Sequence, residues 1–330
     1  MVCHLVPRHQ TMSKVCSFSL FRRLQYFWLR SSSFASSVPK LLLFSFFYLT
    51  VATLLQVPSG NYLSSPAYAQ SSAEQITPQE SHRLENFLIS TKGRDDWKRM
   101  MLAILNSVPA VESVLSEGVS VNIRGTDEFH GVTPLMFASG IGAQVIVKFL
   151  VEKGARLNDT DTLGKTALIQ AAYKGRPETV SFLLQQGANP TAETNQQWTA
   201  LMFAAERGEL EILKTLLIHG ARVDFQNKLA MSSAMYAAKN GHFEIVQLLL
   251  KRGIIVDLTS LNGSTALIWA IRSGHEKIVE LLLEAGAKTD SLEDEFQRTP
   301  LLLAAMYGLE STVHKLLSSG ADLAAVDKQG

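Results

Sequence analysis

The chain has 330 residues, of which 46% are hydrophobic and 18% are charged, and this composition excludes intrinsic disorder because it supplies enough apolar side chains for a large core. Six of the 31 basic residues and none of the 30 acidic residues precede Glu74, which leaves 25 basic and 30 acidic residues in the body of the chain; we therefore expect no nucleic-acid partner. Both cysteines, Cys3 and Cys16, also precede Glu74, which excludes a disulfide scaffold, a thiolate metal site and cysteine catalysis from the body.

The segment 1–69 has the pattern of an export signal. Residues 41–57 (LLLFSFFYLTVATLLQV) form an almost unbroken apolar run behind six basic residues, and Ala67-Tyr68-Ala69 matches the small-residue pattern at which signal peptidase cuts. We therefore expect cleavage after Ala69 and a periplasmic or secreted protein. Two alternatives stay open: residues 41–57 are retained as a membrane anchor, or the Ser-rich start is a transit peptide that leads to an organelle lumen. The polar, Pro-containing residues 70–94 are interpreted as a linker.

A tandem repeat governs the chain from Thr133 onward. Motifs of the form Thr-Pro-Leu or Thr-Ala-Leu, with one Ser-Ser-Ala variant, recur with a period of about 33 residues. The motifs begin at Thr133, Thr166, Thr199, Ser232, Thr265 and Thr299. A glycine follows each start nine residues later, and a second glycine closes the apolar run that comes next. Residues 128–330 are therefore interpreted as six tandem units.

Each unit is expected to form two short antiparallel helices and an extended loop. The Thr or Ser oxygen caps the first helix, and Pro134 and Pro300 suit the first helical position. The two glycines end the two helices in the left-handed conformation. Helices this short are unstable alone, so each unit needs its neighbours to cover its apolar faces. Leucines that share one position of the second helix are expected to be buried between units: Leu183, Leu216, Leu249 and Leu282.

These motifs resemble the ankyrin-repeat family. The resemblance rests on the Thr-Pro-Leu and Thr-Ala-Leu openings, on alanine pairs such as Ala204-Ala205, on Gly241-His242, and on Leu-Leu-x-x-Gly-Ala endings. It implies an all-α fold, an ankyrin-repeat solenoid of stacked helix-turn-helix units with extended loops. It extends to residues 95–127, interpreted as a degenerate N-terminal capping repeat with helices at residues 102–106 and 111–115. It further implies a non-catalytic module that binds an unidentified partner protein; the alternatives are a membrane-anchored docking scaffold and the regulatory part of an enzyme.

Motifs that carry chemistry are weak in this sequence. Residues 164–166 (Gly-Lys-Thr) resemble the end of a phosphate-binding loop, but the residue five positions before them is Asp159 rather than glycine. His242 and His275 share one position of successive units, where the family places a structural residue, and no histidine pair has metal-ligand spacing. We expect no enzyme activity, no cofactor, no metal and no small-molecule substrate. A membrane partner is expected only if residues 41–57 are retained.

The family resemblance places partner binding on the loop tips and on the ends of the first helices, which line the concave side. The candidate partner-binding residues at these positions are Phe129, Leu163, Lys165, Tyr173, Trp198, Arg207, Leu229, Met231, Arg272, Phe296, Arg298 and Tyr307. Glu206, Lys239 and Met306 occupy the same helix ends.

Large apolar residues are unusual at loop tips, which are normally polar. Trp198, Leu229 and Met231, with Lys165 one repeat earlier, are therefore predicted to form one continuous binding patch. The alternative is that some of them fold back onto the neighbouring loop as packing. Phe203 and Trp269 lie within first helices and are expected in the core.

Overall fold

The computed structural model describes residues 95–126, 129–293 and 296–329. The predicted export signal and linker lie outside the described residues. The described part consists of helices, turns and loops with two isolated β-bridges. Among these helices none combines the length and the apolar character needed to cross a membrane.

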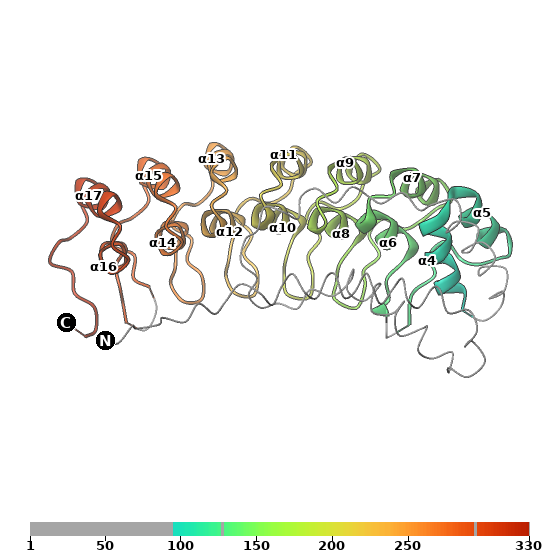
Figure 1. The fold of residues 1–330 in the computed structure, drawn as a ribbon, viewed down its shortest axis with the longest axis horizontal. Coiled ribbons are helices and arrows are strands. Elements are labelled where there is room, and N and C mark those ends of the chain that lie inside the picture. Colours follow the sequence, from blue (N-terminus) through green and yellow to red (C-terminus); the bar gives the residue numbers. More distant parts are fainter. Residues whose placement is uncertain (1–94, 127–128, 294–295, 330) are drawn as a thin grey trace, which may run out of the picture. The chain divides into compact units, whose positions relative to one another are not determined.

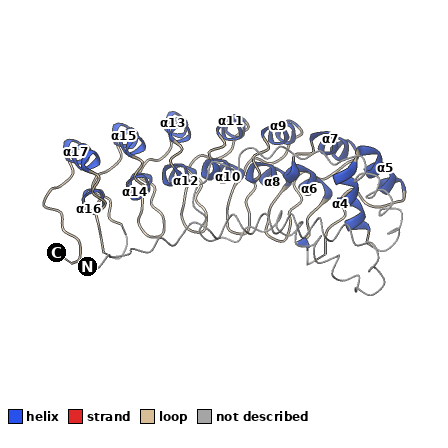
Figure 2. Ribbon diagram, viewed as in Figure 1, coloured by secondary structure: helices blue, strands red, loops and turns tan. Residues whose placement is uncertain are grey.

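The helices form two parallel rows, and the loops extend away from the inner row (Figures 1 and 2). The capping repeat contributes α4 (Asp96–Asn106) and α5 (Val108–Ser116). The first helices of the six repeats form the inner row: α6 (Pro134–Ile141), α8 (Ala167–Tyr173), α10 (Ala200–Arg207), α12 (Ser233–Asn240), α14 (Ala266–Arg272) and α16 (Pro300–Met306). The second helices form the outer row: α7 (Gln144–Glu152), α9 (Pro177–Gln185), α11 (Leu210–Ile218), α13 (Phe243–Lys251), α15 (Glu276–Glu284) and α17 (Glu310–Ser318).

Threonine and serine side chains cap the inner helices, as the sequence predicts. Thr133 Oγ1 accepts a hydrogen bond from the backbone N–H of Met136 at 3.3 Å. The same contact recurs at 3.2–3.4 Å at the start of the other five inner helices. At the far end of α10, Gly208 has a φ of 80°, a left-handed conformation that costs glycine little. These caps satisfy backbone groups that such short helices would otherwise leave without partners.

The core lies between successive repeats. The four leucines of the second helices, Leu183, Leu216, Leu249 and Leu282, are all 0% exposed, which confirms the predicted register. Each inner helix contacts the next along the row, and the alanine pairs of α8, α10 and α12 are fully buried at these contacts. Stability therefore comes from stacking, in which every repeat covers the apolar faces of its neighbours.

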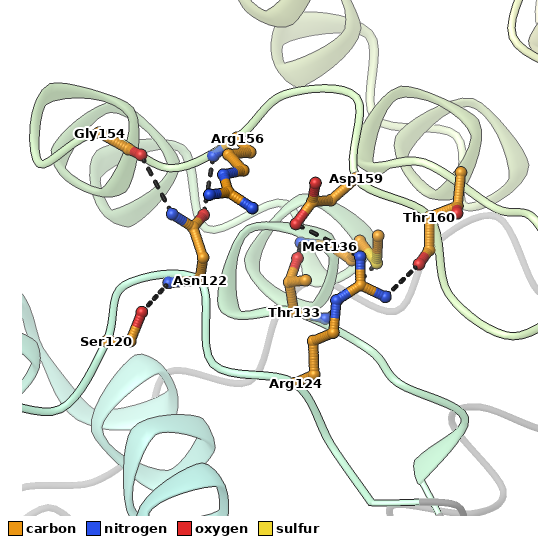
Figure 3. A network of polar contacts seen from close by, with 9 residues as sticks. All are labelled: Ser120, Asn122, Arg124, Thr133, Met136, Gly154, Arg156, Asp159 and Thr160. Carbon is orange, nitrogen blue, oxygen red and sulfur yellow. Dashed lines mark hydrogen bonds and ion pairs between the residues drawn. The ribbon is translucent and has the colours of Figure 1, made fainter.

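Polar side chains join each repeat to the next. Figure 3 shows the joint between the capping repeat and the first full repeat, where Asn122 donates to the carbonyl of Gly154 at 3.3 Å and accepts from the N–H of Arg156 at 2.8 Å. Arg124 donates to the carbonyl of Thr160 at 2.8 Å. At later joints, three side chains accept in the same way from a backbone N–H of the following repeat at 2.8–3.0 Å: Asn158, Asp224 and Asp257.

Two histidines serve these joints as well. His242 Nε2 lies 3.0 Å from the carbonyl oxygen of Glu206, and His275 Nε2 lies 3.2 Å from that of Lys239. The geometry agrees with a structural role for both rings, since each one bridges to the preceding repeat. Across the described ranges, no three His, Cys, Asp or Glu side chains gather closely enough to hold a metal ion.

The first helix of the capping repeat begins earlier than predicted. Helix α4 starts at Asp96 instead of near residue 102, and its first turn carries two large buried side chains. Arg99 is 3% exposed and pairs with Glu117 at 2.7 Å, while the Trp97 ring lies 4.0 Å from that of Phe129. The additional turn thus covers the end of the core with aromatic surface.

Candidate protein-binding face

In three successive repeats, the residue directly before the inner-helix cap is held in place by a polar side chain five residues before the cap. That side chain accepts a hydrogen bond from the backbone N–H of the residue before the cap, which keeps the loop base rigid. The pairs are Asp161 with Lys165 at 2.8 Å, Thr194 with Trp198 at 3.0 Å, and Asn227 with Met231 at 3.0 Å. The side chains at this position therefore stand beside the inner helices.

The loop tips expose a series of leucines. Leu163, Leu229 and Leu261 are 48%, 58% and 75% exposed. The tips are bonded to one another through the backbone: Leu163 O accepts from Asn195 N at 2.9 Å, and Leu229 O accepts from Leu261 N at 3.0 Å. These apolar side chains therefore stand on an ordered edge.

Four aromatic rings meet across α8, α10 and α12, and we call them the aromatic row: Tyr173, Trp198, Phe203 and Tyr236. The Phe203 ring lies 5.2 Å from Tyr173, edge to face, and 4.7 Å from Trp198, stacked. Trp198 also lies 4.5 Å from Tyr236. Tyr173 and Trp198 are half-buried, whereas Phe203 and Tyr236 are buried. Two rings thus support two others that remain accessible.

Cations surround the accessible ring of Tyr173. Lys165 Nζ and Lys174 Nζ lie 5.0 and 5.1 Å from its centroid, and Arg207 Cζ lies at 5.6 Å. All three distances allow a cation–π interaction. We call these four residues the Tyr173 group. Its three cations come from different places: Lys165 lies at the loop base before α8, Lys174 follows α8, and Arg207 ends α10.

A second group of this kind, the Trp269 group (Trp269, Lys239 and Arg272), lies further along the inner row. Lys239 Nζ is 4.9 Å and Arg272 Cζ is 5.8 Å from the half-buried Trp269 ring. Arg272 also pairs with Glu293, whose side chain is 0% exposed and accepts a hydrogen bond from Ser264 Oγ at 2.7 Å. Arg272 is therefore neutralised in part within the chain.

Burial and charge shift the pKa values of this face. Burial lowers the pKa of the Lys174 ammonium, and the nearby cations Arg207 and Lys165 lower it further. Burial raises the pKa of the Glu206 carboxyl, although Arg207 and Lys239 act in the opposite direction. The two groups together place five cations on the inner face, although acidic residues outnumber basic ones in the body of the chain.

The structure distributes the twelve sequence-predicted candidates over three environments. Exposed candidates are Leu163, Arg207, Leu229, Arg272 and Tyr307. Half-buried candidates are Lys165, Tyr173, Trp198, Phe296 and Arg298. Buried candidates are Phe129 and Met231, which are 7% and 5% exposed. We therefore remove the last two residues from the candidate face.

The physical reason differs between the two buried candidates. Phe129 is covered by Trp97, whose Nε1 also donates to the carbonyl of Val132 at 2.7 Å. Met231 precedes a helix cap, a position that points inward: the equivalent Val132 and Ser264 are 3% and 0% exposed. Only the longest side chains at this position extend beyond the core. The predicted patch of Trp198 with Met231 is accordingly replaced by contacts between Trp198 and inner-helix rings.

Sequence reasoning missed or misplaced three residues of this face. Lys174 and Tyr236 were not candidates, and Trp269 was expected in the core but is half-buried. The core prediction for Phe203 is confirmed at 9% exposed. A signal was available, because Phe203, Tyr236 and Trp269 all stand four residues after their cap. A bulky ring at one repeat position in three successive units indicates a shared surface.

The fold and the joints define a solenoid of tandem helix-turn-helix repeats, in which the inner helices and loops form one face. The family model for ankyrin repeats, in blocks of three copies, matches residues 100–194, 155–227, 201–293 and 234–327. The chain belongs to the ankyrin-repeat family. Ankyrin repeats are in general protein–protein interaction modules and are typically non-catalytic.

Two known proteins illustrate the similarity. An ankyrin repeat domain from Acinetobacter baumannii AYE superposes with a TM-score of 0.54 at 30% sequence identity, over 57% of this chain and 98% of that domain. The transient receptor potential cation channel subfamily V member 6 of Rattus norvegicus is 35% identical over 71 residues, or 18% of this chain. The match spans only 9% of the length of the channel.

Proposed function

We propose that this chain is an exported, non-catalytic binding protein that holds a partner protein against its inner helices and loop tips. The observation that supports the proposal is the aromatic row with its surrounding cations. Half-buried rings beside arginine and lysine have the composition of protein-interface anchors. The exposed leucines of the loop tips add apolar surface on the loops that precede the inner helices.

The rigidity of the face also favours protein binding. The loop bases are held by side-chain hydrogen bonds, and the loop tips are bonded to each other through the backbone. A pre-ordered surface loses little conformational entropy when a partner binds. The accessible residues come from several successive repeats, which suits a partner that lies along the stack.

Site-specific photo-crosslinking tests the proposed face. A photoreactive amino acid is placed at Leu229, 58% exposed on a loop tip, or at Ile218, 72% exposed at the end of the outer helix α11. Both positions are exposed and apolar, so they differ mainly in the face on which they lie. We expect crosslinks to one partner protein from position 229 and none from position 218. Crosslinks from position 218 alone would exclude the inner face.

Export is the second part of the proposal and rests on the sequence alone. If the signal is cleaved after Ala69, the mature protein begins at Gln70. Mass spectrometry of the N-terminus of the protein from its host tests this. Recovery of residues 41–57 in the membrane fraction would instead indicate the anchored form, and full-length protein in the cytosol would contradict both forms.

A further inference from the structure

Among the described residues, cations outnumber carboxylates along the inner-helix ends and loop bases. Five cations lie there: Lys165, Lys174, Arg207, Lys239 and Arg272. The carboxylates beside them are the half-buried Glu206, the buried Asp161 at the loop base of Lys165, and the fully buried Glu293, which is already paired with Arg272. Lys239 and Arg272 occupy the same position at the end of the inner helix in their repeats, and Tyr173 occupies this position in an earlier repeat.

The Tyr173 group is a place where like charges are held together. Two ammonium groups and a guanidinium lie within 5.0–5.6 Å of one ring centroid. The cation–π interaction offsets part of their repulsion. The lowered pKa of Lys174 reflects burial together with the remaining repulsion. An anion placed above the ring would relieve that repulsion, because it interacts favourably with all three cations.

We propose that the partner binds through an acidic segment, extended along the inner face, whose carboxylates contact the Tyr173 group and the Trp269 group and whose apolar side chains contact the loop-tip leucines. This inference rests on the proposed protein-binding function and specifies the chemistry of its partner. A single small anion would occupy one group only. A segment that runs from α8 to α14 reaches both, with the aromatic row between them.

A single-stranded nucleic acid would also present regularly spaced negative charge, but the observations favour a peptide. Trp198 packs against Phe203 at 4.7 Å and against Tyr236 at 4.5 Å, and these contacts reduce the ring area that could stack on bases, which nucleic-acid binding uses. Glu206 lies between the two cation groups, since Arg207 of one group and Lys239 of the other both act on its carboxylate. A negative charge at this point would repel a continuous phosphate backbone. A peptide can place a neutral or basic residue at that point.

The test selects binders for the full-length chain from a random peptide library displayed on phage. We expect the recovered peptides to be enriched in Asp and Glu interspersed with apolar residues. Synthetic copies are then titrated by fluorescence anisotropy. Arg207→Glu and Lys239→Glu should each weaken binding by at least about tenfold, a rise in Kd that corresponds to about 1.4 kcal/mol. Binding should also weaken as the salt concentration rises.

Matched variants on other surfaces serve as controls. Arg222 is exposed and lies over the ring of Phe225, with its Cζ 4.4 Å from the centroid, but it follows the outer helix α11. Lys277 is exposed on the outer helix α15. Arg222→Glu and Lys277→Glu make the same change of charge and should leave binding unchanged. Arg207→Gln, which removes the charge without reversing it, keeps the test valid if Arg207→Glu unfolds the chain.

Each other outcome contradicts a different statement. If the selected peptides show no acidic enrichment but bind the Leu229→Ala variant more weakly, the proposal of an acidic segment is wrong and the proposed binding face stands. Peptides that lose binding only with Arg222→Glu or Lys277→Glu would overturn both. A labelled oligo-deoxythymidine that displaces the peptides and binds more tightly would show that the face recognises nucleic acid, which overturns this inference as well.

Discussion

The Trp198 side chain is both a packing residue and a proposed anchor, and its truncation to alanine tests both roles. The ring contacts Phe203 at 4.7 Å and Tyr236 at 4.5 Å between centroids. Each such aromatic pair contributes about 0.5–1.5 kcal/mol beyond its buried area, so two pairs predict a loss of about 1–3 kcal/mol. A fully buried tryptophan would lose about 3–5 kcal/mol, and the half-buried Trp198 should fall below that range.

Urea unfolding followed by circular dichroism measures the stability part. Leu229→Ala is the matched variant, since Leu229 is 58% exposed on the adjacent loop tip and its truncation should change stability by less than about 0.5 kcal/mol. Both variants should weaken partner binding. If Trp198→Ala changes stability as little as the exposed-leucine control does, the ring is not packed. A stability loss with unchanged affinity of the folded protein would show that it is packing alone.

Three further predictions concern the core, the loop turns and the pH dependence. Leu216→Ala, at a fully buried position, should cost about 2–5 kcal/mol in thermal or urea unfolding, and a cost below about 1 kcal/mol would contradict the register. Gln197 has a φ of 59°, a left-handed conformation that glycine adopts more easily, so Gln197→Gly should stabilise the chain by about 1 kcal/mol. Gly164→Ala should destabilise the chain, because a Cβ there would lie 2.7 Å from the Asn195 backbone nitrogen. Burial raises the pKa of Tyr236 from 10.0 to about 12, so the unfolded chain ionises first and stability should fall as the pH rises through this window. Ultraviolet titration should show a late tyrosine signal that Tyr236→Phe removes.

The repeat architecture was predictable because its signals are local. Each signal can be recognised within a single unit: a Thr or Ser at the cap, a glycine nine residues later, and a leucine at one position of the second helix. These signals recur in all six units. Leu216 is buried because its own helix presents it to the stack, whatever the neighbouring loop contains. Boundaries were less predictable at the start, where α4 begins at Asp96 and no preceding unit provides a register.

The candidate face was predictable only in part because its contacts join residues of different repeats. Whether Phe129 is exposed depends on Trp97, and the surroundings of Tyr173 depend on Arg207 from the next unit. Side-chain length decides the outcome at the position before the cap. There Met231 stays inside, while Trp198 extends to the inner face.

Stability and recognition use different positions of the same repeat. The leucine position of the second helix keeps one residue type in four successive units and is 0% exposed in each, since a change there opens a cavity between two repeats. The position at the end of the first helix changes freely, from Tyr173 through Glu206 and Lys239 to Arg272, because it covers no neighbouring core. The stack therefore holds the inner face in a constant frame while the chemistry of that face varies. On the proposed function, we therefore expect the charge and aromatic pattern of the inner face, rather than the fold, to determine the choice of partner.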